Sequence, residues 1–364
     1  MCTSFKCILR RNNNYASNAS AMQNAVGNAT SGTRNISIPL RLICKTLFPT
    51  KWVNASQNLR SMNQENETKT TAKQGKQALF MKNFIKAGRC FYGIGIVALG
   101  IHQLVIKDFR QDILPPFPAW AHEYIVFSIL TGIALIFAGI IISGLFTIKL
   151  VNTKSICLYL GFCFLAIIIT CHLPYILILS PNKASRLDGW FDAGEALAYC
   201  GGAFVMAGSF SKNSFSEDRQ NFFELRIEKL VPLGRFFYST LIILFGCSHF
   251  VFTSFVSTMV PKWIGAPVFW TYFAGVALIG SGVAIIFKIW IRPIAFLLAI
   301  MLFLFFIFFH VPAAIANPSM GGGNEIVRAI IALLFCGIAT VIALTNNPRI
   351  KLGKTTKTDW KNDF

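Results

Sequence analysis

The chain has 364 residues, of which 54% are hydrophobic and only 13% are charged, against about 25% charged residues in soluble domains. Most of its length therefore cannot face water, which excludes a soluble protein of two or three domains. The net charge of +19 does not indicate a nucleic-acid partner, because Lys and Arg lie in short connectors between apolar runs and in the two tails. The composition predicts a multi-pass membrane protein.

The first 80 residues differ from all that follow. They are rich in Asn, Ser and Thr, and Glu65 is their first acidic residue. Such a segment cannot build a core, so we expect residues 1–80 to be a disordered or dispensable leader. Its content of Arg and Ser without acids is typical of an organellar transit peptide. The alternative, which we favour, is that translation starts at Met81, because MKNFIKAGR is a short basic stretch directly before the first apolar run.

Eight apolar runs follow, and each is long enough to cross the hydrocarbon core of a membrane as a helix. Helix is expected because the backbone must satisfy its own hydrogen bonds in lipid. The predicted fold class is an all-α membrane protein with eight transmembrane helices. The runs cover residues 88–106, 123–150, 155–180, 190–210, 233–252, 267–290, 293–316 and 325–345.

The distribution of basic residues predicts the orientation. From residue 81 onward, the connectors and tail on one side of the membrane hold seventeen Lys and Arg residues, and those on the other side hold six. The positive-inside rule therefore places both termini in the cytoplasm, together with a linker at 212–232 and a basic tail at 346–364. Trp120 and Trp263 fall near the outer boundary, where aromatic side chains are enriched.

Two parts of the chain, residues 81–211 and 233–345, share an ordered series of motifs. G-R-x-F-Y opens the first run of each half, P-x-W precedes the second run, and H-x-P lies late in the third. Matches in this order indicate an internal repeat. Because each half has four spans, an even number, the copies share one orientation and are predicted to be tandem parallel four-helix repeats. The matched pairs include Gly88 and Gly234, Arg89 and Arg235, Tyr92 and Tyr238, Trp120 and Trp263, and His172 and His310.

These motifs, together with a Gly-x6-Gly spacing in the second span and the run Gly201-Gly202-Ala203 in the fourth, resemble the DoxX-like integral membrane proteins. That family is typically a single four-helix unit, so the resemblance implies two fused units over residues 81–345. Some relatives are linked to quinone-coupled sulfur oxidation or to terminal oxidases. The resemblance therefore implies the bacterial inner (plasma) membrane and a redox enzyme as partner. The Gly-Gly-Ala run is missing at 332–338, which predicts a looser approach of the last helix.

The histidines lie at or near the outer ends of the predicted spans. We expect two polar layers in the outer leaflet: His102, His172 and Glu195 in the first half, and His249, His310 and Glu325 in the second. Three interpretations stay open. Each His can snorkel or bond a carbonyl that the nearby proline frees, which we favour; the layer can bind a quinone-like or lipid head group; or His and Glu can hold a metal.

The G-R-x-F-Y motifs are expected to be structural. Arg89 with Tyr92, and Arg235 with Tyr238, are three residues apart and so share a helix face. They start spans at the cytoplasmic side, where such residues anchor helices at the interface. We therefore expect anchoring rather than substrate binding.

The sequence carries no signature of an enzyme. It has no glycine-rich phosphate loop, no G-x-S-x-G, no H-E-x-x-H and no C-x-x-C, so no catalytic residue or required cofactor is predicted. Three hypotheses remain: an accessory or redox-associated membrane subunit that interacts with quinone or lipid, a transporter of a small apolar or weakly polar solute, and a purely structural membrane protein.

Overall fold

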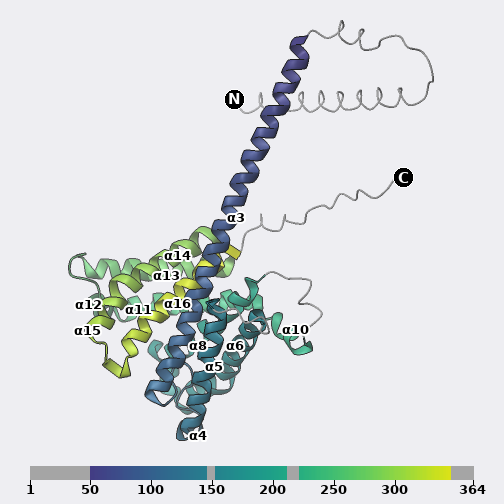
Figure 1. Ribbon diagram of the computed structural model, residues 1–364. Coiled ribbons are helices and arrows are strands. Elements are labelled where there is room, and N and C mark those ends of the chain that lie inside the picture. Colours follow the sequence, from purple (N-terminus) through teal and green to yellow (C-terminus); the bar gives the residue numbers. More distant parts are fainter. Residues whose placement is uncertain (1–49, 146–151, 211–220, 346–364) are drawn as a thin grey trace. The chain divides into compact units, whose positions relative to one another are not determined.

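The computed structural model describes residues 50–145, 152–210 and 221–345, and every regular element in them is helical (Figure 1). The predicted all-α class is confirmed. The chain divides into one unit of residues Met1–Gly75 and another of Lys76–Phe364. The first half contains α3 (Thr50–Ile106), α4 (Ala119–Glu123), α5 (Ile125–Ser143), α6 (Thr153–Ile167), η1 (Ile168–His172), η2 (Tyr175–Leu179), α7 (Pro181–Ala184), η3 (Leu187–Trp190) and α8 (Phe191–Gly208).

The second half also has four long helices. It contains α10 (Phe222–Glu228), η4 (Val231–Leu233), α11 (Gly234–Val251), α12 (Thr253–Thr258), α13 (Pro267–Phe287), α14 (Ile291–Phe305), η5 (Phe306–His310), α15 (Val311–Ala316), η6 (Met320–Gly322) and α16 (Asn324–Thr345). The predicted linker at 212–232 is described only from residue 221, where α10 begins after Asn221. The tail at 346–364 lies outside the described residues.

Seven helical segments of the described residues are long and apolar enough to cross a membrane, which identifies an integral membrane protein. They are Gln64–Ile106, Ile125–Ser143, Thr153–Leu179, Phe222–Val251, Pro267–Phe287, Ile291–Ala316 and Met320–Thr345. The predicted span that is not among them, the fourth (residues 190–210), is helix α8, which is less apolar because it carries Asp192 and Glu195 and many small residues. Most of its residues are buried by protein, so α8 has little surface that lipid could contact.

Residues 50–80 are part of helix α3, which runs without a break into the first apolar run. The expectation of disorder is therefore wrong for this part of the leader. Good helix formers are frequent here, and Lys69 pairs with Glu65 one turn earlier at 2.6 Å. Residues 64–80 are exposed, so they add nothing to a core, and their dispensability stays a prediction. Residues 1–49 lie outside the described residues.

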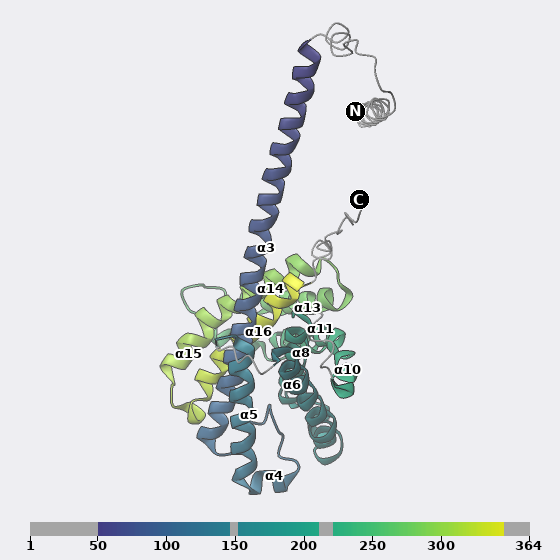
Figure 2. The same ribbon diagram turned by 45° about the vertical axis from the view of Figure 1, so that its right-hand side comes forward.

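Two contacts between glycines join the halves. A Cβ atom on Gly337 of α16 would lie 2.5 Å from the Gly88 carbonyl oxygen of α3, and one on Gly201 of α8 would lie 2.6 Å from that of Gly234 in α11. In each contact, the first helix of one half lies against the last helix of the other. The looser approach predicted for the last helix is wrong, because Gly337 lets α16 approach α3 closely, as Gly201 lets α8 approach α11. In Figures 1 and 2, α8, α11 and α16 accordingly lie together at the centre of the helices.

A second pair of contacts recurs within the halves. The Tyr92 hydroxyl donates to the Tyr199 carbonyl at 2.7 Å, and the Tyr238 hydroxyl donates to the Phe335 carbonyl at 2.9 Å. Both tyrosine side chains are fully buried. Interfacial anchoring is therefore the wrong interpretation for them, since each joins the first helix of its half to the fourth.

The third helix of each half contains one more matched feature. The π-helical turns η1 and η5 end at His172 and His310, two residues before the H-x-P prolines. A proline lacks the N–H that would bond one turn back, and π turns are rare and frequent at functional sites. Both histidines therefore sit where the regular helix is interrupted.

Candidate functional site

A cavity of about 520 Å³ lies in the second half, among α11, α13, α14, η5 and α16. Its wall is mainly apolar, and Phe335, Ile331 and Leu302 form part of it. Trp270, Phe273 and Phe308 line the cavity and are also exposed, so it reaches the apolar outer surface of the helices. An apolar cavity with a few convergent polar groups is the usual form of a small-molecule site.

Four ionisable side chains line this cavity: His249 of α11, His310 of η5, Arg328 of α16 and Glu195 of α8. The His249 ring donates from Nδ1 to the carbonyl of Phe245 at 2.7 Å, which leaves Nε2 for other contacts. The cavity of the second half thus combines three nitrogen-bearing side chains with one carboxyl group from the first half.

In the first half, the connector after α3 forms a buried ion pair. Arg110 binds both oxygens of Asp112, with Nε at 2.9 Å from Oδ1 and Nη2 at 3.1 Å from Oδ2. The Asp112 side chain is 3% exposed and that of Arg110 9%. Burial by itself would lower the pKa of Arg110, but the adjacent Asp112 carboxylate outweighs it and the pKa is raised.

This ion pair is the centre of a larger polar network. The Tyr199 hydroxyl donates to Asp112 Oδ2 at 2.8 Å and lies 3.4 Å from Glu195 Oε2. Arg110 Nη1 donates to the Asn324 side-chain oxygen at 2.8 Å and to Nδ1 of His102 at 3.0 Å. Because a guanidinium can only donate, His102 accepts at Nδ1 and donates from Nε2 to the Gly321 carbonyl, 3.2 Å away.

His172 lies beside the same connector. Its ring shares a hydrogen bond with the backbone of Ile113 and interacts with the Asp112 charge, and its buried Nε2 has no hydrogen-bond partner in the described residues. The matching position in the second half, His310, lines the cavity. Connector residues thus lie beside His172, whereas a cavity lies beside His310.

Other positions support this correspondence. The two tyrosine hydrogen bonds match Tyr199 with Phe335, which on the same register matches Glu195 with Ile331. Phe335 and Ile331 line the cavity, as Glu195 does, whereas the Tyr199 hydroxyl binds Asp112. On this register Glu195 corresponds to Ile331 and not to Glu325.

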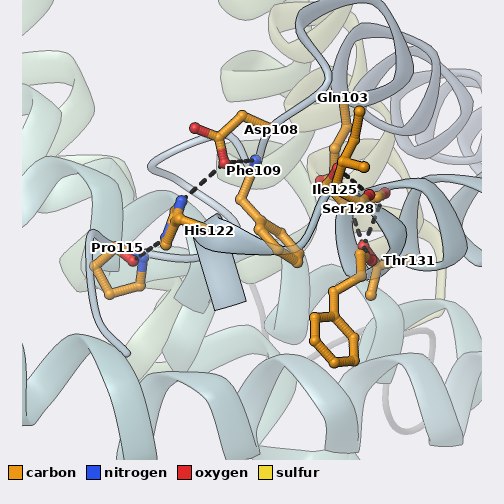
Figure 3. Close-up of polar contacts among 9 residues, drawn as sticks. Gln103, Asp108, Phe109, Pro115, His122, Ile125, Ser128 and Thr131 are labelled. Atoms are coloured by element: carbon orange, nitrogen blue, oxygen red, sulfur yellow. Dashed lines mark hydrogen bonds and ion pairs between the residues drawn. The ribbon is translucent and has the colours of Figure 1, made fainter. Parts of the chain in front are cut away.

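The connector at residues 107–118, here named the first outer loop, is fixed by buried side chains and by hydrogen bonds. Phe109, Ile113 and Leu114 are buried in the core. Figure 3 shows His122 bridging the loop: Nδ1 lies 2.8 Å from Asp108 Oδ1, and Nε2 lies 2.8 Å from the Pro115 carbonyl oxygen. Beside it, Gln103 donates to the Ser128 carbonyl at 2.8 Å, which ties the end of α3 to α5.

The corresponding connector of the second half, residues 252–266 or the second outer loop, is different. It contains the short helix α12, and none of its residues is buried. Val256, Met259 and Ile264 border the cavity without filling it.

The predicted polar layers are thus partly assembled. In the first half, His102 and Glu195 flank the Arg110–Asp112 pair, and His172 lies next to it. In the second half, His249 and His310 meet at the cavity. Glu325 is not among the cavity residues; it accepts from Arg328 Nη1 at 2.8 Å.

The remaining predicted residues have structural contacts. Arg89 donates from Nε to the Ser209 hydroxyl at 2.7 Å and lies over the Phe210 ring, while Arg235 lies over the Phe236 ring. Trp120 and Trp263 are exposed. Their position at the outer boundary stays a prediction.

Sequence reasoning missed four site residues: Arg110, Asp112, Tyr199 and Arg328. Arg110 and Arg328 were counted only as charges of the outer side. One signal was available, because Tyr199 follows Glu195 by four residues and so shares its helix face. In the described residues, no group of three His, Cys, Asp or Glu side chains could hold a metal ion.

Comparison with known proteins adds one finding. Residues 238–342 match a family described as a domain of unknown function (DUF8561). The match begins in α11 and ends in α16, so it covers the four long helices of the second half. No curated protein and no solved structure matches the chain.

Proposed function

We propose that this protein is an accessory, redox-associated membrane subunit that binds an isoprenoid quinone, or a lipid with a similar head group, in the cavity of its second half. The cavity carries the proposal. Its apolar wall suits an isoprenoid or acyl chain, and His249, His310 and Arg328 are groups that can hydrogen-bond a carbonyl oxygen.

The route of entry supports a membrane-borne ligand. Trp270, Phe273 and Phe308 belong to the cavity wall and are exposed. Exposed aromatic side chains on a membrane helix face lipid, so a ligand could pass from the bilayer into the cavity without crossing water. A water-soluble substrate would find no polar approach on this side.

We further propose eight spans arranged as two tandem DoxX-like repeats. Matched glycine contacts, tyrosine hydrogen bonds and π turns in the two halves support the repeat. The family match over residues 238–342 supports a unit of four helices. In this arrangement α8 is a span in addition to the seven apolar segments, and its neighbours shield it from lipid.

The basic residues support an orientation with both termini on the cytoplasmic side of the membrane. The DoxX-like resemblance favours the bacterial inner membrane as the location. Alkaline phosphatase fused after Lys183 should be active, since that connector is predicted to be outside. The same fusion after Glu217 should be inactive. The reverse pattern would contradict the orientation.

Ligand binding is tested by what the protein retains on purification. The full chain is purified from membranes in mild detergent, and co-purifying quinone and phospholipid are quantified by mass spectrometry. We expect retained isoprenoid quinone, reduced several-fold in His310→Ala because one carbonyl-binding group is lost from the cavity.

His172→Ala is the matched control, because His172 is the corresponding residue of the first half and does not line the cavity. It should retain quinone as the wild type does. Equal retention by His310→Ala, at unchanged thermal stability, would overturn the proposed site.

A further inference from the structure

We infer that Glu195 carries a proton at neutral pH and is the hydrogen-bond donor that the cavity offers to a carbonyl-bearing ligand. The choice of ligand rests on the proposed function. The protonation of Glu195 is argued separately, from hydrogen-bond geometry. Glu195 belongs to the first half, yet it lines the cavity of the second. It is therefore the group through which the buried network of one half contacts the cavity of the other.

The hydrogen-bond donors near Glu195 indicate whether its carboxyl group is protonated. Tyr199 has a single hydroxyl hydrogen, and Asp112 Oδ2 at 2.8 Å is closer to it than Glu195 Oε2 at 3.4 Å. The Tyr199 hydrogen therefore goes to Asp112. An ionised Glu195 would face the lone pairs of the Tyr199 oxygen and the Asp112 carboxylate, whereas a protonated Glu195 can donate to Asp112, to the Tyr199 oxygen or, in exchange for these, to a ligand in the cavity.

The charges near Glu195 favour the same state. Asp112 and Asp192 lie close enough to disfavour a third negative charge, and the nearest cation of the network, Arg110, binds both oxygens of Asp112. Two carboxyl groups that share one site do not both ionise readily. On the cavity side, His249, His310 and Arg328 are the titratable or charged side chains that face the same space.

This state defines the ligand that the cavity accepts. A neutral carboxyl group donates one hydrogen bond and adds no charge to an apolar wall, so it suits a neutral ligand with an acceptor oxygen, such as a quinone carbonyl. An ionised carboxylate there would accept hydrogen bonds and would favour a ligand that donates them. Glu195 is thus a specificity-determining residue, and Tyr199 and Asp112 are positioning residues that act through it.

Infrared spectroscopy of the full protein in detergent tests the protonation directly. We expect the carbonyl stretch of a protonated carboxyl group at neutral pH, lost in Glu195→Gln and kept in Glu325→Gln, because Glu325 is paired with Arg328 and does not itself line the cavity. Adding a short-chain benzoquinone should shift this band to lower frequency. Asp112→Asn should make the band disappear at a lower pH than in the wild type, because one neighbouring negative charge is removed.

The outcomes separate this inference from the proposed function. If the protein retains quinone but shows no Glu195-dependent band at neutral pH, or the band does not move on quinone binding, the inference is overturned and the proposed function stands. If the band is present but no quinone is retained by the wild type, the proposed function is overturned and the donor role with it. Glu195→Gln keeps the shape of the side chain, so loss of the band in this variant does not require loss of folding.

Discussion

Each half of the molecule has a tyrosine hydrogen bond from its first to its fourth long helix and a glycine contact with the other half, but the space beside the H-x-P histidine differs between them. In the first half, the outer loop turns inward, and Asp112, Ile113 and Leu114 are buried there. In the second half, the outer loop stays exposed and a cavity of about 520 Å³ remains. The position beside the histidine is thus filled in one half and open in the other, and the connectors of the two halves differ in the same way.

This comparison separates structural residues from ligand-binding ones. His102 and His172 are enclosed by the buried ion pair and the first outer loop, whereas His249 and His310 line an open space. In the first half, the chain itself supplies the backbone carbonyl oxygen of Ile113 to His172 and a carboxylate oxygen to Tyr199. Both partners are acceptor oxygens that lie next to apolar side chains.

The largest effect should come from breaking the buried pair of the first half. Asp112→Ala leaves Arg110 buried without its carboxylate, and removing one partner of a buried pair costs about 3–5 kcal/mol. Thermal unfolding in detergent measures the loss. Lys262→Ala in the exposed second outer loop is the control and should change stability by less than about 0.5 kcal/mol. Equal melting of both variants would contradict the importance of the pair.

The next largest effect should be a loss of stability of equal size from two glycine substitutions, one in each half. Gly201→Val and Gly337→Val each insert a side chain where a Cβ already meets a carbonyl oxygen at 2.6 or 2.5 Å. Overpacking of this kind costs about 1–3 kcal/mol. A Cβ on Gly280, by contrast, meets nothing within 4 Å, so Gly280→Val should cost little. A large loss from only one of the two contacts would show that the halves are not joined symmetrically.

A smaller matched pair tests the hydrogen bonds within each half. Tyr92→Phe and Tyr238→Phe remove one donor each and leave the ring packing in place, so each should cost about 1 kcal/mol. Unfolding in detergent again gives the measurement. If one substitution were neutral and the other costly, the register that matches Tyr199 with Phe335 would lose its support.

The smallest effect should be local. His122→Ala removes both bridges across the first outer loop, and the His122 side chain is partly exposed, so global stability should fall by less than about 1 kcal/mol. Limited chymotrypsin digestion should nevertheless cut the variant faster after Trp120, which is exposed and lies in α4 beside His122. Unchanged cleavage would mean that the buried residues of the loop hold it without His122.

Much of the helical frame could be predicted from the sequence. Hydropathy located seven helical segments that are apolar enough to cross a membrane, and the predicted start at residue 267 and the predicted end at residue 106 agree with α13 and α3. The inward turn of the first outer loop could not be predicted, because hydropathy assigns Arg110 and Asp112 to the water. Only the geometry shows that their charges cancel at 2.9 Å, which is what lets them be buried. The cavity escaped prediction for a related reason, since Glu195 reaches it from the other half.

The glycine contacts impose an order on biogenesis. Gly88 lies in the first span to be synthesised, and its partner Gly337 lies in the last. Helix α3 can pack against α5 and α8 of its own half earlier, but its surface at Gly88 stays uncovered until α16 is inserted. Neither half can complete its packing alone, so a chain that ends before the last helix leaves the Gly88 contact unmade.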